Sequence, residues 1–241
     1  MNLTNNQINY ASRDESIPVA KTFLSGVFMW MGLALSITAV VSWLFASSGS
    51  MMNILYDTQT QSMNMAGWIV MLAPLGLVLW MSMGFQKLSA STLVLIFIGY
   101  SILMGMSISF IFLIYTLPSI AKTFVVTAAM FGFMGVLGYT TKTDLTKFGS
   151  IMIMGLVGII IASVINMFMQ SDTMEYVISF IGVIVFTGLT AYDVQKLKRI
   201  GNTLSMDTEA ARKVTIMGAL TLYLDFINLF LFLLRFFGGR K

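Results

Sequence analysis

Long stretches without a charged residue dominate this sequence. Five of them span residues 22–56, 58–86, 88–121, 123–141 and 148–171. A helix needs about 20 apolar residues to cross a bilayer, and each stretch has roughly that length or more. The strands of membrane β-barrels give weak alternating patterns of about ten residues instead. The runs therefore predict an all-α integral membrane protein that crosses the bilayer several times.

Composition excludes most other classes of protein. Charged residues make up 10% of the chain and hydrophobic residues 57%, whereas soluble domains average about 25% charged residues. The chain contains neither histidine nor cysteine. Disulfides, cysteine or histidine zinc sites and serine–histidine catalysis are therefore excluded. The net charge of +4 does not indicate nucleic-acid binding, because lysine and arginine mark the cytoplasmic loops of membrane proteins.

Seven membrane spans are expected from the hydropathy pattern. The predicted spans are 23–46, 66–85, 91–115, 123–139, 148–169, 176–192 and 214–237. The fourth span is short because Lys122 lies directly before it. It can extend toward the N-terminus past Lys122 if that side chain snorkels to the membrane surface. Residues 1–21 are polar and predict a mobile N-terminal tail, and residues 22–241 are expected to form a single seven-helix domain.

Small residues recur on the fourth span. Gly132, Gly135 and Gly138 are spaced by three, and Gly155 and Gly158 repeat the spacing on the fifth span. Small residues let transmembrane helices approach closely. This pattern predicts tight helix packing.

The distribution of lysine and arginine predicts the orientation. With a cytoplasmic N-terminus, ten of the fourteen cations lie inside: Arg13, Lys21, Lys87, Lys142, Lys147, Lys196, Lys198, Arg199, Arg212 and Lys213. The four outside are Lys122, Arg235, Arg240 and Lys241. By the positive-inside rule the N-terminus is then cytoplasmic and the C-terminus lies outside.

Two aspartates lie within predicted spans. Asp193 is placed at the cytoplasmic end of the sixth span, and Asp225 is roughly 16 Å into the seventh at 1.5 Å per residue, near the midplane. Intramembrane acids usually face a cavity and mark ion or proton pathways. The two spans are consecutive and antiparallel, so the carboxyl groups approach each other if the last helix starts late or tilts. Two carboxyl groups in one apolar site titrate as a unit.

Polar residues accompany both aspartates. Thr221 and Asn228 share a helix face with Asp225, and Thr190 shares one with Asp193. Calcium binds oxygen ligands, which the side chains of these polar residues and the two carboxylates supply. The polar residues are therefore candidate ion contacts, and Asp193 and Asp225 are a candidate site for transient calcium binding.

Plainer interpretations remain open for the same residues. Asp193 can be an interfacial acid paired with Lys196 or Lys198 in its own last turn. Asp225 can form a structural hydrogen bond or a salt bridge. Arg235 is interpreted as a residue that snorkels at the outer interface, with a pore charge or a charge partner as the alternative.

The sequence around these aspartates resembles the Bax inhibitor family and is similar to its bacterial members. The strongest match is residues 220–235, LTLYLDFINLFLFLLR. The Tyr192-Asp193 pair, with Gly182 and Phe186 upstream, is the second, and residues 138–145 give a weaker match. The seven-span layout agrees over essentially the whole chain. The resemblance implies a bundle with the last helix at its centre, in the bacterial inner membrane.

The resemblance implies a function as well, a pH-sensitive calcium leak. Asp193 and Asp225 would act together as the pH sensor and gate, without enzymatic activity and without a cofactor beyond permeant calcium. Bacterial relatives can carry arginines at the cytoplasmic end of the second span as a latch. Here Lys87 is the only cation at that place, and it lacks the bidentate fork of arginine. Partners other than the bilayer and calcium stay open.

Two other functions compete with a leak. A proton-coupled transporter could use the acids as relays. An intramembrane aspartyl protease also needs two aspartates on adjacent helices, but that class is expected to carry Gly-x-Gly-Asp, and the residues before Asp225 are Leu222, Tyr223 and Leu224.

Overall fold

The computed structural model describes residues 4–57, 62–204 and 208–239, with side chains from residue 20 onward. Seven helices in these ranges are long and apolar enough to cross a membrane, which confirms the predicted fold class. The seven are α1 (Thr4–Ser47), α3 (Met65–Gly84), α4 (Ala90–Ile108, which α5, Ile111–Ile114, extends), α6 (Leu117–Thr140), α7 (Thr146–Met169), α8 (Asp172–Gly201) and α9 (Glu209–Phe237).

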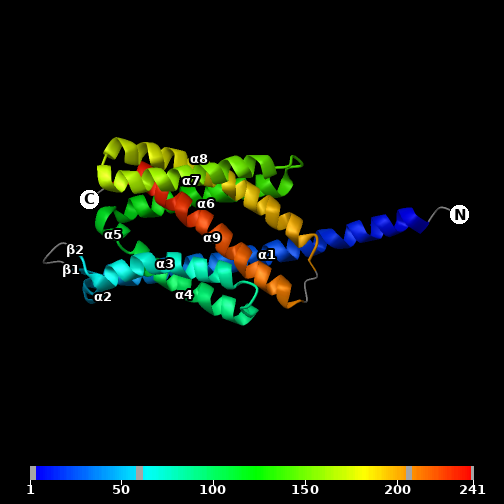
Figure 1. Cartoon of the computed structure of the whole chain (residues 1–241), viewed down its shortest axis with the longest axis horizontal. Helices are drawn as coiled ribbons and strands as arrows, with labels where there is room; N and C mark the ends of the chain where they lie inside the picture. The colour runs from blue at the N-terminus through cyan, green and yellow to red at the C-terminus, as the bar shows by residue number, and fades with distance from the viewer. Residues whose placement is uncertain (1–3, 58–61, 205–207, 240–241) are drawn as a thin grey trace.

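Short elements fill the connection between α1 and α3. They are α2 (Gly49–Leu55) and an antiparallel pair of two-residue strands, β1 (Tyr56–Asp57) and β2 (Ser62–Met63). At the other end of the molecule, the polar N-terminal segment continues α1 beyond the bundle (Figure 1). The composition of this segment predicts a mobile tail, whereas the structure has it helical from Thr4 onward. The expected external residues Arg240 and Lys241 lie outside the described part of the chain.

Helix α9 runs through the centre of the bundle. In Figure 1 it crosses diagonally between α6, α7 and α8 on one side and α1, α3 and α4 on the other, and it packs against α1, α4, α6 and α8. Most of its apolar span is buried, whereas α7 exposes most of its own. The predicted central position of the last helix is therefore confirmed.

Polar contacts hold α9 to its neighbours inside the apolar core. The Thr38 hydroxyl of α1 donates to the Ser101 carbonyl of α4 at 2.9 Å. It lies 2.7 Å from the hydroxyl of Tyr223, which must be the donor because Thr38 has only one hydroxyl hydrogen. Tyr223 also packs edge-on against Tyr100 and Phe97. These contacts fix the rotation of α9, and therefore the direction in which Asp225 points.

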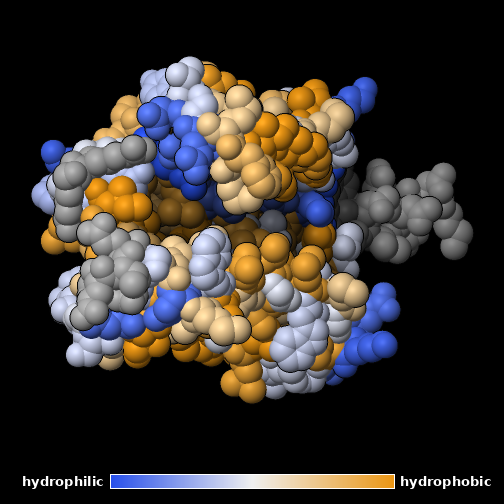
Figure 2. Space-filling view, turned by 60° about the vertical axis from the view of Figure 1, so that its left-hand side comes forward, coloured by the Kyte–Doolittle hydropathy of each residue, from blue (hydrophilic) through white to orange (hydrophobic). Residues whose placement is uncertain are grey.

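The outer surface of the bundle is apolar. Large hydrophobic side chains are exposed on every spanning helix, among them Trp43, Trp68, Trp80, Phe133 and Ile160. Apolar residues cover broad areas of the face in Figure 2. Such a surface would be unstable in water and suits contact with lipid tails.

Candidate functional site

Asp193 of α8 and Asp225 of α9 meet inside the bundle. Their carboxyl groups are within hydrogen-bonding distance of each other. Both side chains are buried, with exposed fractions of 9% and 5%. The two aspartates therefore approach each other, although α9 begins at Glu209, five residues before the predicted start of the last span at 214, and so does not start late.

The pair lacks hydrogen-bond donors. Asp225 Oδ2 is buried and accepts no hydrogen bond within the described part of the chain. A carboxylate oxygen only accepts, but a protonated carboxyl group also donates. One proton between the two groups would therefore supply the missing donor, whereas two ionised carboxylates would repel each other in an apolar site.

Helix α8 extends further past Asp193 than the sequence indicates. Helix α8 continues to Gly201, eight residues beyond Asp193, because the basic segment after it stays helical. The predicted end of the sixth span at residue 192 is therefore too early. Asp225 remains near the middle of α9, between Glu209 and Phe237.

An open cavity of about 310 Å³ reaches Asp193 from one end of the bundle. Its walls come from the end of α3, the last turns of α8 and the first half of α9. It is lined by Ser82, Phe85, Asp193, Lys196, Leu197, Ile200, Val214, Met217, Gly218 and Thr221. Of the two aspartates, Asp193 lines this cavity.

Two aromatic side chains pack together about two helical turns from the pair, on the side away from the cavity. Phe232 of α9 lies against Phe186 of α8, with ring centroids 5.8 Å apart. A Cβ atom on Gly182 would come within 2.6 Å of the Phe232 ring, so Gly182 provides the space that the ring fills. Phe186 and Gly182 lie on the same face of α8 as Asp193, two and three turns toward its N-terminus. We call Phe186 and Phe232 the aromatic plug.

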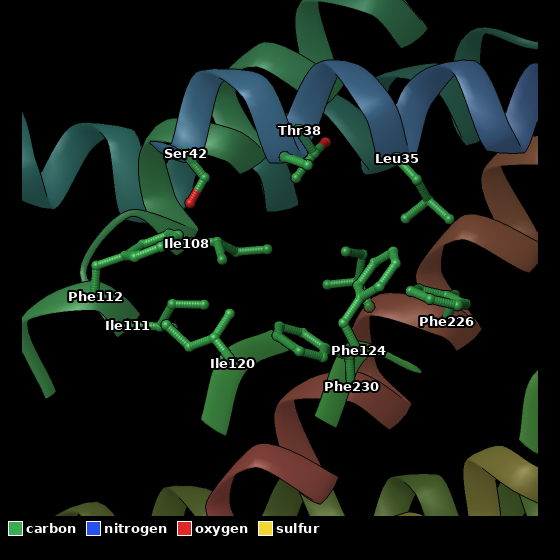
Figure 3. A pocket seen from close by; sticks show the side chains of 12 residues that line it. Leu35, Thr38, Ser42, Ile108, Ile111, Phe112, Ile120, Phe124, Phe226 and Phe230 are labelled. Carbon is green, nitrogen blue, oxygen red and sulfur yellow. The ribbon is translucent and has the colours of Figure 1, made fainter. Parts of the chain in front are cut away.

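A second, apolar pocket lies on a different face of α9. It has a volume of about 100 Å³. In Figure 3, Phe226 and Phe230 of α9 and Phe124 of α6 converge on it, opposite Ser42 of α1. Phe226 and Phe230 are one and five residues after Asp225, which at 100° per residue turns them well away from it. This pocket is therefore not part of the path along α8 and α9.

Comparison with known proteins identifies the family. The family model described as inhibitor of apoptosis-promoting Bax1 matches residues 20–241. The chain belongs to the Bax inhibitor family. The inner membrane protein YbhL of Escherichia coli (strain K12) is 49% identical to it over 222 residues, which cover 92% of this chain and 93% of YbhL. An uncharacterized protein of Borreliella burgdorferi is 44% identical over 234 residues, covering 97% and 99% of the two chains.

The other predicted ion contacts divide into two groups. Thr221 lines the cavity next to Asp193, although its hydroxyl also donates to the Met217 carbonyl. Thr190 and Asn228 donate to carbonyl groups of their own helices, at 2.8 Å in each case. Of these three residues, only Thr221 lines the cavity.

The predicted charge partners lie away from the aspartates. Lys87 follows α3 on the exposed surface, and within the described ranges it forms no ion pair with Asp193. Arg235 lies in the last turn of α9, with its guanidinium carbon 5.8 Å from the centre of the Phe232 ring. Arg235 is therefore on the far side of the aromatic plug from the cavity.

Lys196, one of the two lysines that the sequence offers as a partner of Asp193, lies at the site. It lines the cavity, and its charge acts on Asp193, three residues earlier on α8. The spacing of three was the available signal. Lys198 instead donates to the Tyr139 carbonyl of α6 at 2.8 Å. Of the two lysines, only Lys196 lines the cavity beside Asp193, and the described residues show no ion pair between them.

A polar clamp joins the loop between α6 and α7 to α8. Arg199 bonds to Asp144 at 2.6 Å. Gln195 accepts from the Leu145 amide and donates to the Thr143 carbonyl. Hydrogen bonds from Thr146 and Arg199 hold the pKa of Asp144 well below its usual range. The clamp anchors α8 two residues beyond Asp193.

We expect Asp144→Asn to leave the pH midpoint of any ion flux unchanged. The lowered pKa means that Asp144 contributes to stability above about pH 4, its ordinary pKa, and that this contribution is lost only as the pH falls further. Between pH 6 and 8 its charge is constant. Calcium flux measured over that range checks this, and a shifted midpoint would assign part of the pH response to the clamp.

The residues that the structure describes contain no cluster of three acidic side chains that could hold a metal ion. Two carboxylates are fewer ligands than a calcium ion takes in a stable site, where six to eight oxygens surround it. Any calcium at Asp193 and Asp225 would therefore keep part of its water shell and exchange readily.

Proposed function

We propose that this Bax inhibitor family protein is a pH-sensitive calcium leak, with Asp193 and Asp225 as sensor and gate. The observation that carries the proposal is the contact between two buried carboxyl groups, one of which, that of Asp193, lines an open cavity. Such a pair changes its charge with pH, and its charge decides both whether the helices repel each other and whether a cation is attracted.

The arrangement of groups corresponds to the closed state of such a leak. A shared proton keeps α8 and α9 together, and the aromatic plug blocks the path beyond the pair. Loss of the proton leaves two negative charges in a buried site, which separates the helices and provides oxygen ligands for calcium. By the distribution of lysine and arginine the cavity opens to the cytoplasm.

The test is reconstitution of the full chain into liposomes that contain a calcium-sensitive dye, with flux measured across a range of pH. A leak gives downhill calcium flux that changes with pH. Solute uptake driven by a proton gradient would indicate a transporter instead, and cleavage of a membrane peptide a protease. Tyr223 beside Asp225 is fully buried, so the site offers little room for a peptide backbone.

The aromatic plug gives a prediction of its own. We expect Phe232→Ala to raise calcium flux by about tenfold, because apolar constrictions block ions by excluding water and the shortened side chain opens the constriction. Phe230→Ala is the matched control, since Phe230 lines the separate apolar pocket. The loss of the buried Phe230 ring costs about 3–5 kcal/mol of stability, and the loss of the partly buried Phe232 ring costs less. An equal rise in both variants would indicate general loosening and contradict the assignment.

A further inference from the structure

An open groove lies between α1 and α6 on the outside of the bundle. Its volume is about 290 Å³. Helices α1 and α6 both pack on α8 and α9, so they flank the groove while α8 forms its floor. It is lined by Lys21, Leu24, Phe28, Gly132, Gly135, Val136, Tyr139 and Val194. Apart from Lys21 and the Tyr139 hydroxyl, the lining side chains are apolar.

Glycines of α6 keep this groove open. Gly138 fits the predicted role of a packing residue, because a Cβ atom there would collide with the Ala191 backbone of α8. Gly132 does not fit that role, since a Cβ atom there would meet nothing within 4 Å. At Gly135 a Cβ atom would lie 3.8 Å from Phe28 and 3.9 Å from Val194. Close helix packing therefore explains Gly138 and leaves Gly132 unexplained.

Cationic groups lie at one end of the groove. Lys21 of α1 is exposed and lines it. Within the described ranges, no acidic side chain pairs with Lys21. The Lys198 ammonium contacts Tyr139, which lines the groove, and lies 2.8 Å from the Tyr139 carbonyl and 4.6 Å from the centre of its ring. An ammonium group has three donors, so this contact leaves Lys198 further donors for an anion.

We propose that the groove binds an anionic phospholipid. One acyl chain occupies the apolar channel along Gly132 and Gly135, and the phosphate lies at Lys21 and Lys198. Basic pockets between transmembrane helices are typical sites for anionic lipid headgroups. Acyl chains are as apolar as leucine side chains, so an acyl chain can move from the surrounding lipid into such a channel without a desolvation cost. This site is separate from the aspartate pair and does not depend on the proposed leak.

Charge favours a lipid over a second copy of the chain. A second copy in the same membrane would have the same orientation, and its own lysines would face Lys21 and Lys198. Like charges that face each other across an interface oppose association. A phosphate group at the same place neutralises them.

Native mass spectrometry and thermal unfolding test the proposal. The full chain is placed in nanodiscs of phosphatidylcholine, with or without phosphatidylglycerol, and then transferred to detergent. We expect the wild type to retain one phosphatidylglycerol and to unfold at a higher temperature when that lipid is present. Gly132→Leu is expected to lower the retained lipid by about fivefold or more, because the new side chain fills the channel while leucine is a good helix former.

Two further variants complete the design. Gly158→Leu on α7 also places a side chain in open space, away from the groove, and is expected to retain the lipid. Lys21→Gln should abolish most of the preference for phosphatidylglycerol over phosphatidylcholine. Retention of lipid by Gly132→Leu at the wild-type level would overturn the proposal. So would equal retention of both lipids by the wild type, or a dimer that Gly132→Leu dissociates.

Discussion

Replacing Asp225 with asparagine is expected to make calcium flux nearly independent of pH. The asparagine amide is close in shape to a protonated carboxyl group and donates a hydrogen bond to Asp193. It neither gains nor loses a proton between pH 5 and 9, so it imitates the shared-proton state at every pH. Flux should therefore stay at the low level of the closed state. In the wild type, by contrast, one titrating proton can change the open fraction by up to about tenfold per pH unit.

Asp193→Asn is expected to have a similar effect for the same reason. The two groups share one proton, so an amide at position 193 can supply the donor that Asp225 Oδ2 lacks in the described structure. Flux in liposomes at several pH values measures both variants, and a thermal unfolding curve shows that each is folded. Asp144→Asn serves as the acid control, because Asp144 lies in the clamp and not in the path. A wild-type pH profile in both asparagine variants would remove the pair from the mechanism.

The sequence predicted the fold from a simple physical constraint. Uncharged runs of bilayer length leave little choice but spanning helices, and all seven predicted spans are present. The ends of the spans were less accurate. The fourth helix begins at Leu117, six residues before the predicted start, because the single cation Lys122 does not interrupt it. The sixth helix extends beyond its predicted end because its basic residues favour a helix once the chain leaves the apolar core.

The aspartate pair was predictable because both residues lie on consecutive, antiparallel helices. What surrounds the pair was not. The aromatic plug depends on the fit of the Phe232 ring over Gly182, and the rotation of α9 depends on Thr38, 185 residues away from Tyr223 in the chain. Spacing along one helix shows which residues share a face. It does not show which of several other helices that face meets.

The glycines of α6 lead to the prediction with the largest effect on folding. Gly138→Leu is expected to prevent stable packing of α6 on α8 and to yield little folded protein. A Cβ atom at this position would overlap the Ala191 carbonyl, and a backbone group cannot rotate away as a side chain can. Overpacking typically costs about 1–3 kcal/mol and sometimes more. The gain in helix propensity, about 1 kcal/mol, does not offset that cost where the obstacle is rigid.

Gly132→Leu is the control for this prediction, because it makes the same chemical change six residues away on the same helix. Open space surrounds Gly132, so the gain in helix propensity remains, and in detergent without anionic lipid the variant should unfold at or above the wild-type temperature. Size-exclusion profiles and thermal unfolding in detergent compare the two. If Gly138→Leu folded as well as Gly132→Leu, α6 and α8 could not be in contact at Ala191, and the position of α8 that brings Asp193 to Asp225 would need revision.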